Sequence, residues 1–268
     1  MKKKGPLVSI LMNCFNSEKF IRKSILSALN QTYKNFELVI WDDASSDNTV
    51  KIIKSFKTKK IKFFYNRLHL GLGKSRILAQ KFLKGKFIAI LDSDDIWEKN
   101  KIKIQIREFY KKKKIGFVAS WYKLVDDKNK ILTYVNKSYD QKNFLKYICK
   151  NNIFAHSSII YNKEYAKKVG WYDDKLEYAQ DYDLTVKLLK LYNFKLINNY
   201  LVKIRISNNS MSLSKKLQYI IIKEKIIILR KILRLFNLSK FLQFEISKSI
   251  FKQEIKYFLL ILLNKIVR

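Results

Sequence analysis

The chain has 268 residues, which suits one large domain or one domain with an appendage. Hydrophobic residues make up 48% of it, enough for a buried core, and this excludes a chain that is disordered throughout. Its 56 Lys and Arg against 22 Asp and Glu give a formal net charge of +34. Such a charge attracts nucleic acid or an anionic membrane, although a composition biased towards surface lysine gives the same number.

Two cysteines are present, Cys14 and Cys149, and their separation matches no zinc-binding spacing. We therefore expect two reduced thiols, as in cytoplasmic proteins, and no structural disulfide. The first residues lead from lysines at 2–4 into a strand-like segment and lack the long apolar stretch of a signal peptide. Export is therefore not expected.

Strand-like and helix-like segments alternate through the first part of the chain. Their patterns predict strands at 8–12, 37–41, 61–65 and 87–91, and helices at about 17–30, 49–56 and 73–83. Strands that alternate with helices indicate a mainly parallel sheet with helices on both faces. Crossovers in such sheets are right-handed in nearly all known proteins, so the loops that follow the strands gather at one edge.

The alternation becomes less regular after residue 98. We expect a basic helix over about 99–113, strands at 116–121, 131–134 and 157–161, and helices at about 140–150 and 180–191. No linker separates this part from the first. The sequence therefore predicts one α/β domain over residues 1–213, with a Rossmann-like mixed sheet that is mainly parallel and flanked by helices.

The last 55 residues, 214–268, form a basic tail with 13 Lys or Arg, 3 Glu, and neither Gly nor Pro. Apolar residues recur in it at helical spacing: Ile222, Ile226, Leu229, Leu233 and Phe236, then Phe251, Ile255, Phe258 and Leu262. This pattern predicts two amphipathic helices with a break near 237–240. The longest apolar run, 257–263, is far shorter than the ~20 residues that span a bilayer.

Polar side chains follow three of the predicted strands. Residues 13–16 include two Asn, Asp42 and Asp43 follow the second strand, and residues 92–95 read Asp-Ser-Asp-Asp. Carboxylate oxygens are the ligands that Mg²⁺ and Mn²⁺ prefer, and α/β proteins bind ligands at the carboxyl edge of the sheet. An acid directly after a strand at this edge can also accept hydrogen bonds from a nucleotide base or ribose. The sequence therefore predicts a metal site at a nucleotide-binding edge.

Five segments of the chain carry a resemblance to a known family. They are residues 8–16, 31–37 (Gln-Thr-Tyr-Lys-Asn-Phe-Glu), 42–49 (Asp-Asp-Ala-Ser-Ser-Asp-Asn-Thr), 91–95 (Leu-Asp-Ser-Asp-Asp) and 179–184 (Ala-Gln-Asp-Tyr-Asp-Leu). Together, over about residues 7–212, the chain resembles the family 2 glycosyltransferases. The resemblance implies a GT-A fold and an inverting enzyme that transfers a sugar from a nucleotide-diphosphate donor, commonly UDP-linked, with help from Mn²⁺ or Mg²⁺.

The resemblance also implies roles for individual residues. The donor would be bound by Asn13, Asn16, Asp42, Asp43, Arg76, Asp92, Ser93 and Arg205, and the metal by Asp92, Asp94 and Asp95. Asp43 is the better candidate for the base, and Asp95 would replace or assist Asp94. Arg76 either faces the diphosphate or is an ordinary residue at a helix start. Arg205 and the following Ser-Met-Ser at 210–212 resemble a segment that folds over the donor phosphates.

On the acceptor side, Asp181 would be the catalytic base that takes the proton of the attacking hydroxyl. The alternative is that Asp181 only caps the helix that begins there. The family usually has Glu where Gln180 stands, so the charge beside the base is reduced. His156, Trp171 and Gln180 would contact the acceptor, although a lone His is more often structural and an aromatic residue beside Gly170 is equally suited to the core.

Two other functions remain possible from the sequence. A nucleic-acid-binding protein would explain the charge of +34 and the 14% aromatic residues, but the acids gather at one predicted edge and no recognition motif is present. A GT-A scaffold with little or no activity is suggested only by Gln180. The favoured prediction is a transferase that glycosylates a glycan or a lipid-linked acceptor in bacterial surface polysaccharide synthesis.

The tail suggests where such an enzyme would work. Amphipathic helices with Lys-rich faces bind anionic headgroups, at about 1 kcal/mol for each basic residue near the surface. The alternative is that their apolar faces pack on the catalytic domain or pair in a dimer. We expect packing for the first tail helix and membrane contact for the second, in a cytoplasmic protein at the inner face of the cell membrane without a specific nucleic-acid partner.

Overall fold

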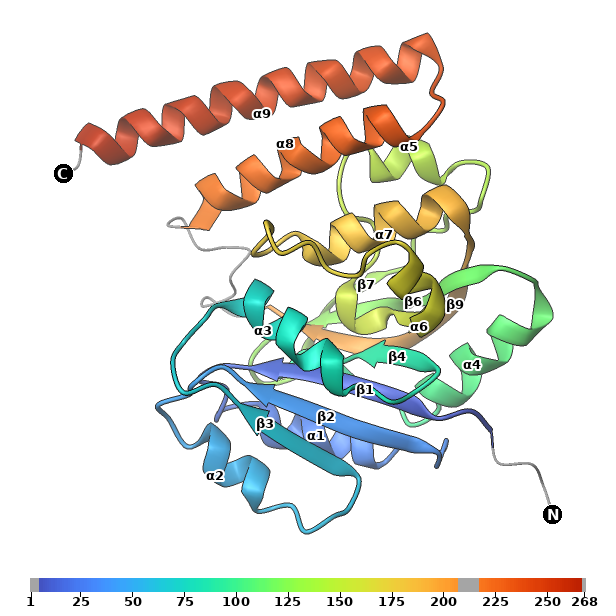
Figure 1. Ribbon diagram of the computed structural model, residues 1–268, viewed down its shortest axis with the longest axis vertical. Coiled ribbons are helices and arrows are strands. Elements are labelled where there is room, and N and C mark those ends of the chain that lie inside the picture. Colours follow the sequence, from blue (N-terminus) through green and yellow to red (C-terminus); the bar gives the residue numbers. More distant parts are fainter. Residues whose placement is uncertain (1–4, 207–216, 267–268) are drawn as a thin grey trace.

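The computed structural model describes residues 5–206 and 217–266, and the strands in these ranges form a single nine-stranded sheet. The strand order is β3-β2-β1-β4-β8-β6-β9-β5, and β7 pairs with β6 outside this path (Figure 1). Helices cover both faces of the sheet, and two further helices from the end of the chain lie outside one of these layers. The predicted α/β architecture is therefore confirmed.

The first four long strands are parallel and agree with those predicted from the sequence. They are β1 (Val8–Cys14), β2 (Phe36–Asp42), β3 (Ile61–Tyr65) and β4 (Phe87–Ile90). The strands β1, β2 and β4 are almost continuously apolar because both of their faces are buried. The register pairs Asn13 with Trp41 and Cys14 with Asp42, so the loops that follow β1 and β2 leave the sheet side by side.

The second half of the sheet is mixed in direction. Its strands are β5 (Ile96–Trp97), β6 (Ile115–Val125), β7 (Ile131–Val135), β8 (Ile160–Asn162) and β9 (Asn193–Arg205). β8 runs antiparallel to β4 and to β6, whereas β6 and β9 form a long parallel ladder. The predicted strand at 157–161 is wrong in its first half, because His156–Ser158 forms a 3₁₀ turn before β8 begins.

The long strand β9 was not predicted from the sequence. Asn198, Asn199 and flanking lysines interrupt its apolar pattern, and its pairing with β6 shifts register around Trp121. A strand of this kind is recognisable only from the neighbour to which it is hydrogen-bonded.

Alternation along the strands divides the core into two clusters. Ile10 and Met12 face helices α1 (Ile21–Leu29), α2 (Thr49–Lys54) and α4 (Lys101–Lys111). Leu11 faces the opposite layer, which contains α3 (Leu72–Ala79), α5 (Phe144–Ile148), α6 (Lys163–Lys168) and α7 (Gln180–Leu191). A short 3₁₀ turn, Gln80–Phe82, follows α3. The helices agree with the predicted ones except α6, which the sequence did not indicate.

The first tail helix, α8 (Gln218–Leu235), belongs to the core of the domain. Ile222, Ile226 and Leu229 are buried in the same cluster as Leu184 and Leu188 of α7. The predicted packing of this helix is therefore confirmed.

The second tail helix, α9 (Lys240–Ile266), packs on α8 and is the outermost element of this layer (Figure 1). Its inner face is formed by Ile246 and Ile250, whereas Phe251, Ile255 and Phe258 of the predicted stripe are 63%, 46% and 61% exposed. Among residues 5–206 and 217–266, no helix is both long and apolar enough to cross a bilayer.

Candidate active site

The loops that follow β1, β2 and β4 are hydrogen-bonded to one another. Asn16 Oδ1 accepts from the backbone N–H of Ser46 at 2.9 Å, and the hydroxyl groups of Ser17 and Ser93 lie 2.8 Å apart. Asn16 has a φ of 46°, a left-handed conformation that asparagine tolerates well. The side chains of Asn16 and Ser93 thus join the loops to each other at the predicted edge.

The carboxylate of Asp42 accepts hydrogen bonds within the turn that follows β2. One oxygen accepts from the backbone N–H of Ser45 at 2.9 Å and the other from the Ser45 hydroxyl at 2.5 Å. Asp42 is only 1% exposed. Its contacts therefore shape the loop after β2.

Asp43 anchors the segment that leads into α3. Its Oδ1 accepts from Asn66 Nδ2 at 2.6 Å and from the Leu70 N–H at 3.0 Å, and its Oδ2 accepts from the Gly71 N–H at 2.8 Å. Gly71 has a φ of +91°, which favours glycine. By contrast, the buried Nδ2 of Asn13 at the end of β1 has no partner among the described residues and is a donor open to a ligand.

Three carboxyl groups gather in the loop after β4. Ser157 Oγ donates to Asp92 Oδ2 at 3.1 Å and accepts from the Asp92 N–H at 3.0 Å. Burial, together with the charge of Asp92, raises the pKa of Asp94 to about 6. Burial and the neighbouring Asp94 also raise the pKa of Asp95 well above its usual value. The loop therefore holds more negative charge than the protein compensates.

Asp92 and Asp94 are the two acids of this loop whose side chains remain partly exposed. Within the described ranges, no group of three or more His, Cys, Asp or Glu side chains is arranged to hold a metal ion. Asp95 is the least suited of the three predicted metal ligands, because it is buried and its Oδ1 accepts from the backbone N–H of Arg205 at 2.9 Å. Two carboxylates are a sufficient protein contribution for Mg²⁺, which commonly takes its remaining ligands from water and phosphates.

Arg205, a predicted phosphate-binding residue, lies behind this loop. Its guanidinium donates to the carbonyl of Asp94 at 3.0 Å, to the carbonyl of Asp126 at 2.5 Å and to Asn129 Oδ1 at 2.6 Å. All three nitrogens thus hold the β6–β7 turn against the acidic loop, and a role in phosphate binding receives no support from these contacts. The predicted Ser-Met-Ser segment at 210–212 lies outside the described residues.

Arg76, His156 and Tyr172 form a buried chain beside Asp92. Burial and the charge of Arg76 lower the pKa of His156, so the imidazole is neutral. Its Nδ1 accepts from Arg76 Nη2 at 3.1 Å, which leaves the Nε2 proton to donate to the Tyr172 hydroxyl at 3.2 Å. Asp92 Oδ1 lies 3.9 Å from His156 Nδ1, but a neutral ring forms no ion pair with it. His156 therefore orients Arg76.

The second guanidinium nitrogen of Arg76 has a different environment. Arg76 is only 6% exposed, and its buried Nη1 has no hydrogen-bond partner among the described residues. A buried cationic donor without a partner is costly unless a ligand supplies the acceptor. The open donor of Arg76 is of the kind that an anion satisfies.

Asp181 is the second residue of α7, and the cap position is held by Ala179. The alternative that Asp181 is the helix cap is therefore wrong. Its Oδ2 accepts from Asn152 Nδ2 at 2.8 Å. Burial raises the pKa of Asp181, while Arg76 lowers it and Asp92 raises it, so these three groups share one electrostatic environment. A carboxylate with a raised pKa is the better general base.

The other two predicted acceptor residues, Gln180 and Trp171, make contacts with other parts of the domain. Gln180 is completely buried, and its Nε2 donates to the carbonyls of Gly73 and Asp173 at 3.2 and 3.0 Å. Trp171 is partly buried against the core, and its carbonyl accepts from Lys187 at 2.5 Å. The buried Oε1 of Gln180, by contrast, has no partner among the described residues.

Sequence analysis missed two residues of this cluster, Asn152 and Ser157. They lie in irregular segments, where no periodicity marks a functional side chain. The signals close to the cluster were His156, which Ser157 follows directly, and the aromatic pair formed by Trp171 and Tyr172.

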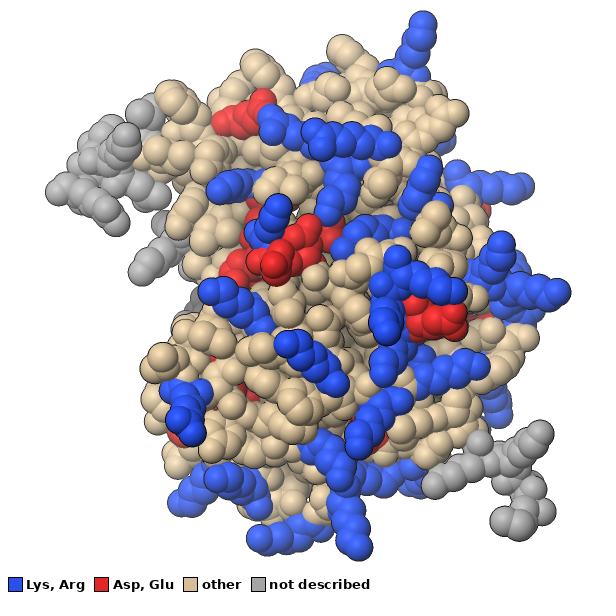
Figure 2. All heavy atoms as spheres, in the orientation of Figure 1, with Lys and Arg blue, Asp and Glu red and all other residues tan. Residues whose placement is uncertain are grey.

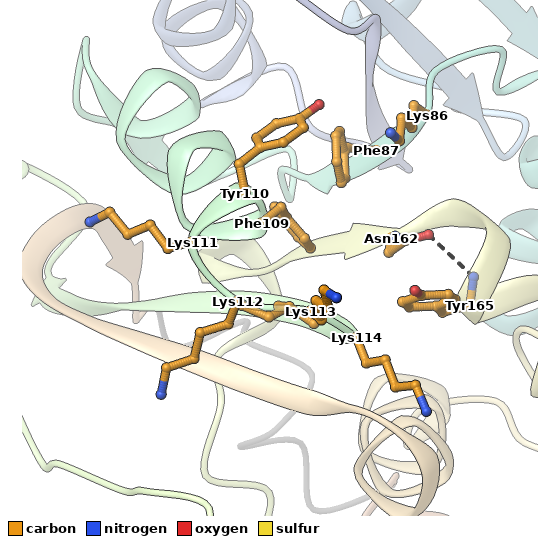
Figure 3. A pocket seen from close by; sticks show the side chains of 11 residues that line it. Lys86, Phe87, Phe109, Tyr110, Lys111, Lys112, Lys113, Lys114, Asn162 and Tyr165 are labelled. Atoms are coloured by element: carbon orange, nitrogen blue, oxygen red, sulfur yellow. Dashed lines mark hydrogen bonds between the residues drawn. The ribbon is translucent and has the colours of Figure 1, made fainter.

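A cavity of about 610 Å³ opens at the opposite end of β4 (Figure 3). Lys86 and residues 111–114, all lysines, line it together with aromatic rings, and no acidic side chain does. It lies at the start of β4, whereas Asp92 follows the end of that strand. The cavity is therefore separate from the acidic cluster.

Comparison with known proteins identifies the family. Residues 9–170 match the family model described as Glycosyl transferase family 2. An uncharacterized glycosyltransferase of Methanocaldococcus jannaschii, MJ1057, is 35% identical over 216 residues, which cover 78% of this chain and 74% of that protein. The Escherichia coli UDP-Glc:alpha-D-GlcNAc-diphosphoundecaprenol beta-1,3-glucosyltransferase WfaP is 36% identical over 213 residues, which cover 78% of this chain and 81% of that protein.

Solved structures agree on the fold. Staphylococcus aureus TarS 1–349 in complex with UDP-GlcNAc superposes with a TM-score of 0.71 and 19% identity, covering 93% of this chain and 73% of that one. The mannosyltransferase PcManGT of Pyrobaculum calidifontis, in complex with GDP-Man and Mn²⁺, has a TM-score of 0.66 and 14% identity, covering 94% of this chain and 70% of that one. The predicted GT-A fold is therefore confirmed.

We predict that Asp94→Asn stabilises the metal-free protein at neutral pH. Folding raises the pKa of Asp94 from 3.8 to about 6, so ionisation of Asp94 destabilises the folded state. This destabilisation is complete above pH 6 and vanishes below pH 3.8. Thermal unfolding with a chelator should show a rise of about 2 to 6 °C at pH 7.5 and a smaller one at pH 4.5. Asp174→Asn, at an exposed position, is the control. An equal shift at both pH values would contradict this account.

Proposed function

This chain belongs to glycosyl transferase family 2, and from that premise we propose that it transfers a sugar, with inversion, from a UDP-sugar to a hydroxyl group of a lipid-linked glycan. One observation carries this proposal. Arg76 and Asp92, from separate parts of the chain, lie 3.1 and 3.9 Å from Nδ1 of the buried His156, and their charges act in opposite directions on the pKa of the buried Asp181. That arrangement provides a base, an anion-binding group and a metal ligand together.

Four side chains support the donor side of the proposal. Asp92 and Asp94 would hold Mn²⁺ or Mg²⁺, and the cation, when bound, withdraws charge from the diphosphate leaving group. The open Nη1 of Arg76 suits a phosphate oxygen, for which guanidinium is well matched. The unpartnered amide of Asn13 would donate to the nucleotide.

Asp181 would act as the general base. Its carboxylate takes the proton from the acceptor hydroxyl as that oxygen attacks the anomeric carbon on the side opposite the leaving diphosphate. The new bond forms as the bond from the anomeric carbon to the leaving phosphate oxygen breaks, which inverts the configuration. Asn152 holds one carboxylate oxygen at 2.8 Å and so limits the rotation of the base.

The acceptor class is inferred from the relatives. WfaP and WfgD, the latter 34% identical over 211 residues, are both described as glucosyltransferases that act on alpha-D-GlcNAc-diphosphoundecaprenol. A lipid-linked glycan for surface polysaccharide synthesis is therefore our proposed acceptor.

The alternative functions gain little support. Gln180 donates to two backbone carbonyls, which an ionised Glu does not do, so its departure from the family pattern has a structural explanation. Lys and Arg are spread over the face seen in Figure 2 and do not gather in one stripe that would follow a nucleic-acid backbone.

Nucleotide-sugar binding can be tested by thermal unfolding with a panel of UDP-, GDP- and dTDP-sugars. In the presence of Mn²⁺ the cognate donor should raise the unfolding temperature by several degrees, because saturation to 100 times Kd adds about 2.7 kcal/mol. Asp94→Ala should abolish the shift, whereas Asp174→Ala should retain it. A panel in which no donor protects the wild-type protein would reject the proposed reaction.

The role of the base predicts a separation between binding and transfer. Asp181→Asn should lower the rate of sugar transfer by about 10²–10⁴-fold, the usual contribution of a general base. Protection by the donor should remain, because Asp181 is not among the proposed donor residues. Asp174→Asn serves as the control, and a variant at Asp181 that keeps its transfer rate would exclude this residue as the base.

We also propose that the outer face of α9 contacts an anionic membrane. Phe251, Ile255 and Phe258 are exposed on this face, and Lys248 and Lys252 are exposed beside them. Apolar side chains bordered by lysines suit the boundary between headgroups and acyl chains. A lipid-linked acceptor would be found at the same surface.

Phe251→Glu tests this contact. Sedimentation with vesicles that contain phosphatidylglycerol should weaken by about tenfold or more, since one buried Phe contributes roughly 1.5–3 kcal/mol. Leu132→Glu is the matched control, because Leu132 is also exposed, at 54%, but lies on β7. Equal vesicle binding by Phe251→Glu and wild type would contradict the proposal, as would a wild-type dimer that Phe251→Glu dissociates.

A further inference from the structure

A buried carboxylate from α8 reaches the segment that precedes the proposed base. Glu224 is only 4% exposed. Its Oε1 accepts from the backbone N–H of Glu177 at 2.6 Å, and its Oε2 accepts from those of Tyr178 and Ala179 at 2.9 and 2.8 Å. One carboxylate thus binds three successive peptide N–H groups.

These three peptide groups lead directly into α7. α7 begins at Gln180, so two of these N–H groups lie before the helix and the third belongs to its cap residue, Ala179, which offers no side-chain acceptor. Glu224 supplies that acceptor from a helix that lies 45 residues further along the chain. Its negative charge also suits the positive end of the α7 dipole. Glu224 therefore binds the peptide groups that immediately precede α7 and Asp181.

The same segment supports α3, which carries Arg76. Glu177 Oε1 accepts from the Gly73 N–H at 3.2 Å, and Gln180 Nε2 donates to the Gly73 carbonyl, also at 3.2 Å. The backbone of this segment also packs closely against α3 at Gly73. A Cβ atom at this position would lie only 2.6 Å from the carbonyl oxygen of Leu176. The segment held by Glu224 thus contacts the start of α3 through Gly73 and leads into α7, which carries Asp181.

The position of α8 itself is well determined. Lys231, two turns after Glu224, forms ion pairs with the buried Asp183 of α7 and, at 3.3 Å, with Asp173. Ile228 and Ile232 are completely buried in the shared core. Glu224 is therefore presented to the 177–179 segment from a rigid element.

We propose that Glu224 is a positioning residue for catalysis and that α8 completes the active site. Glu224 touches neither substrate; it acts by orienting Asp181, whereas α3, which carries Arg76, is also held by its packing on β1 and β2. The proposal rests on the proposed function, because it takes Asp181 as the base. Misplacement of a reacting group by 1 Å can lower a rate by about 10²-fold, so small displacements of the α7 start are sufficient.

The variants Glu224→Gln and Glu224→Asp test this inference. Gln keeps the shape but replaces one acceptor oxygen with an N–H₂ group, so at least one of the three peptide N–H groups loses its partner. We expect kcat for transfer to fall by about 10- to 100-fold in Glu224→Gln, with the donor KM changed by less than about twofold. Glu224→Asp, which keeps the charge, should recover part of the loss.

Glu254→Gln is the matched control in the same tail. Glu254 pairs with Arg230 at 2.6 Å, between α9 and α8, and makes no contact with the 177–179 segment. This variant should keep the wild-type kcat. A loss in Glu224→Gln that is accompanied by an equal loss of donor protection would indicate general unfolding and overturn the positioning role, as would an unchanged kcat.

Hydrogen exchange separates failure of this inference from failure of the proposed function. If the wild-type protein transfers no sugar with any donor, the proposed function fails, and exchange of the amides at 177–181 still reports on Glu224. Their exchange should accelerate by about tenfold or more in Glu224→Gln and remain unchanged in Glu254→Gln. Unchanged exchange in Glu224→Gln would show that the carboxylate does not hold this segment.

Discussion

The parallel pairing of β1 with β2 and β4 is the constraint on which the site depends. It brings the ends of three strands together, and therefore the loops that carry Asn13, Asp43 and Asp92, although these residues are far apart in the chain. The pairing is stabilised by burial of apolar side chains on both faces of each strand. Polar groups are tolerated only where the strands end. Core formation and the gathering of carboxylates are thus two results of one arrangement.

The acids at this edge differ in burial and in the number of hydrogen bonds that their carboxylates accept. Asp42, Asp43 and Asp95 are almost fully buried, and their oxygens accept from neighbouring backbone or side-chain donors. Asp92 and Asp94 keep more negative charge than their surroundings neutralise. On the other side, Arg76 retains a buried donor without a partner among the described residues. A bound cation would neutralise the negative charge of Asp92 and Asp94, and a diphosphate would accept from the open donor of Arg76.

The rest of the site comes from the second half of the chain and is assembled over long sequence separations. The 3₁₀ turn before β8 presents His156 and Ser157, while α7 presents Asp181. α8 lies in the same core as α7 and provides Glu224 where the segment before Asp181 needs acceptors. The basic tail therefore consists of two helices that differ in how they pack on the domain. Its first helix is part of the catalytic domain, and its second adds an outer layer with an open apolar face.

The sequence by itself determined the four parallel strands, the loops at their ends and the family, because continuous apolar segments and clustered acids are local patterns. It also indicated Asp181 and Arg76 as candidates. Only the tertiary structure decided that Arg205, Gln180 and Asp95 are used inside the fold, and that β9 is a strand. The orientation of α9 was also decided there, since both of its sides are apolar and α8 covers only one. The physical reason is the same in each case: a polar group or an apolar face takes its role from the partner that folding places beside it, and that partner is distant in sequence.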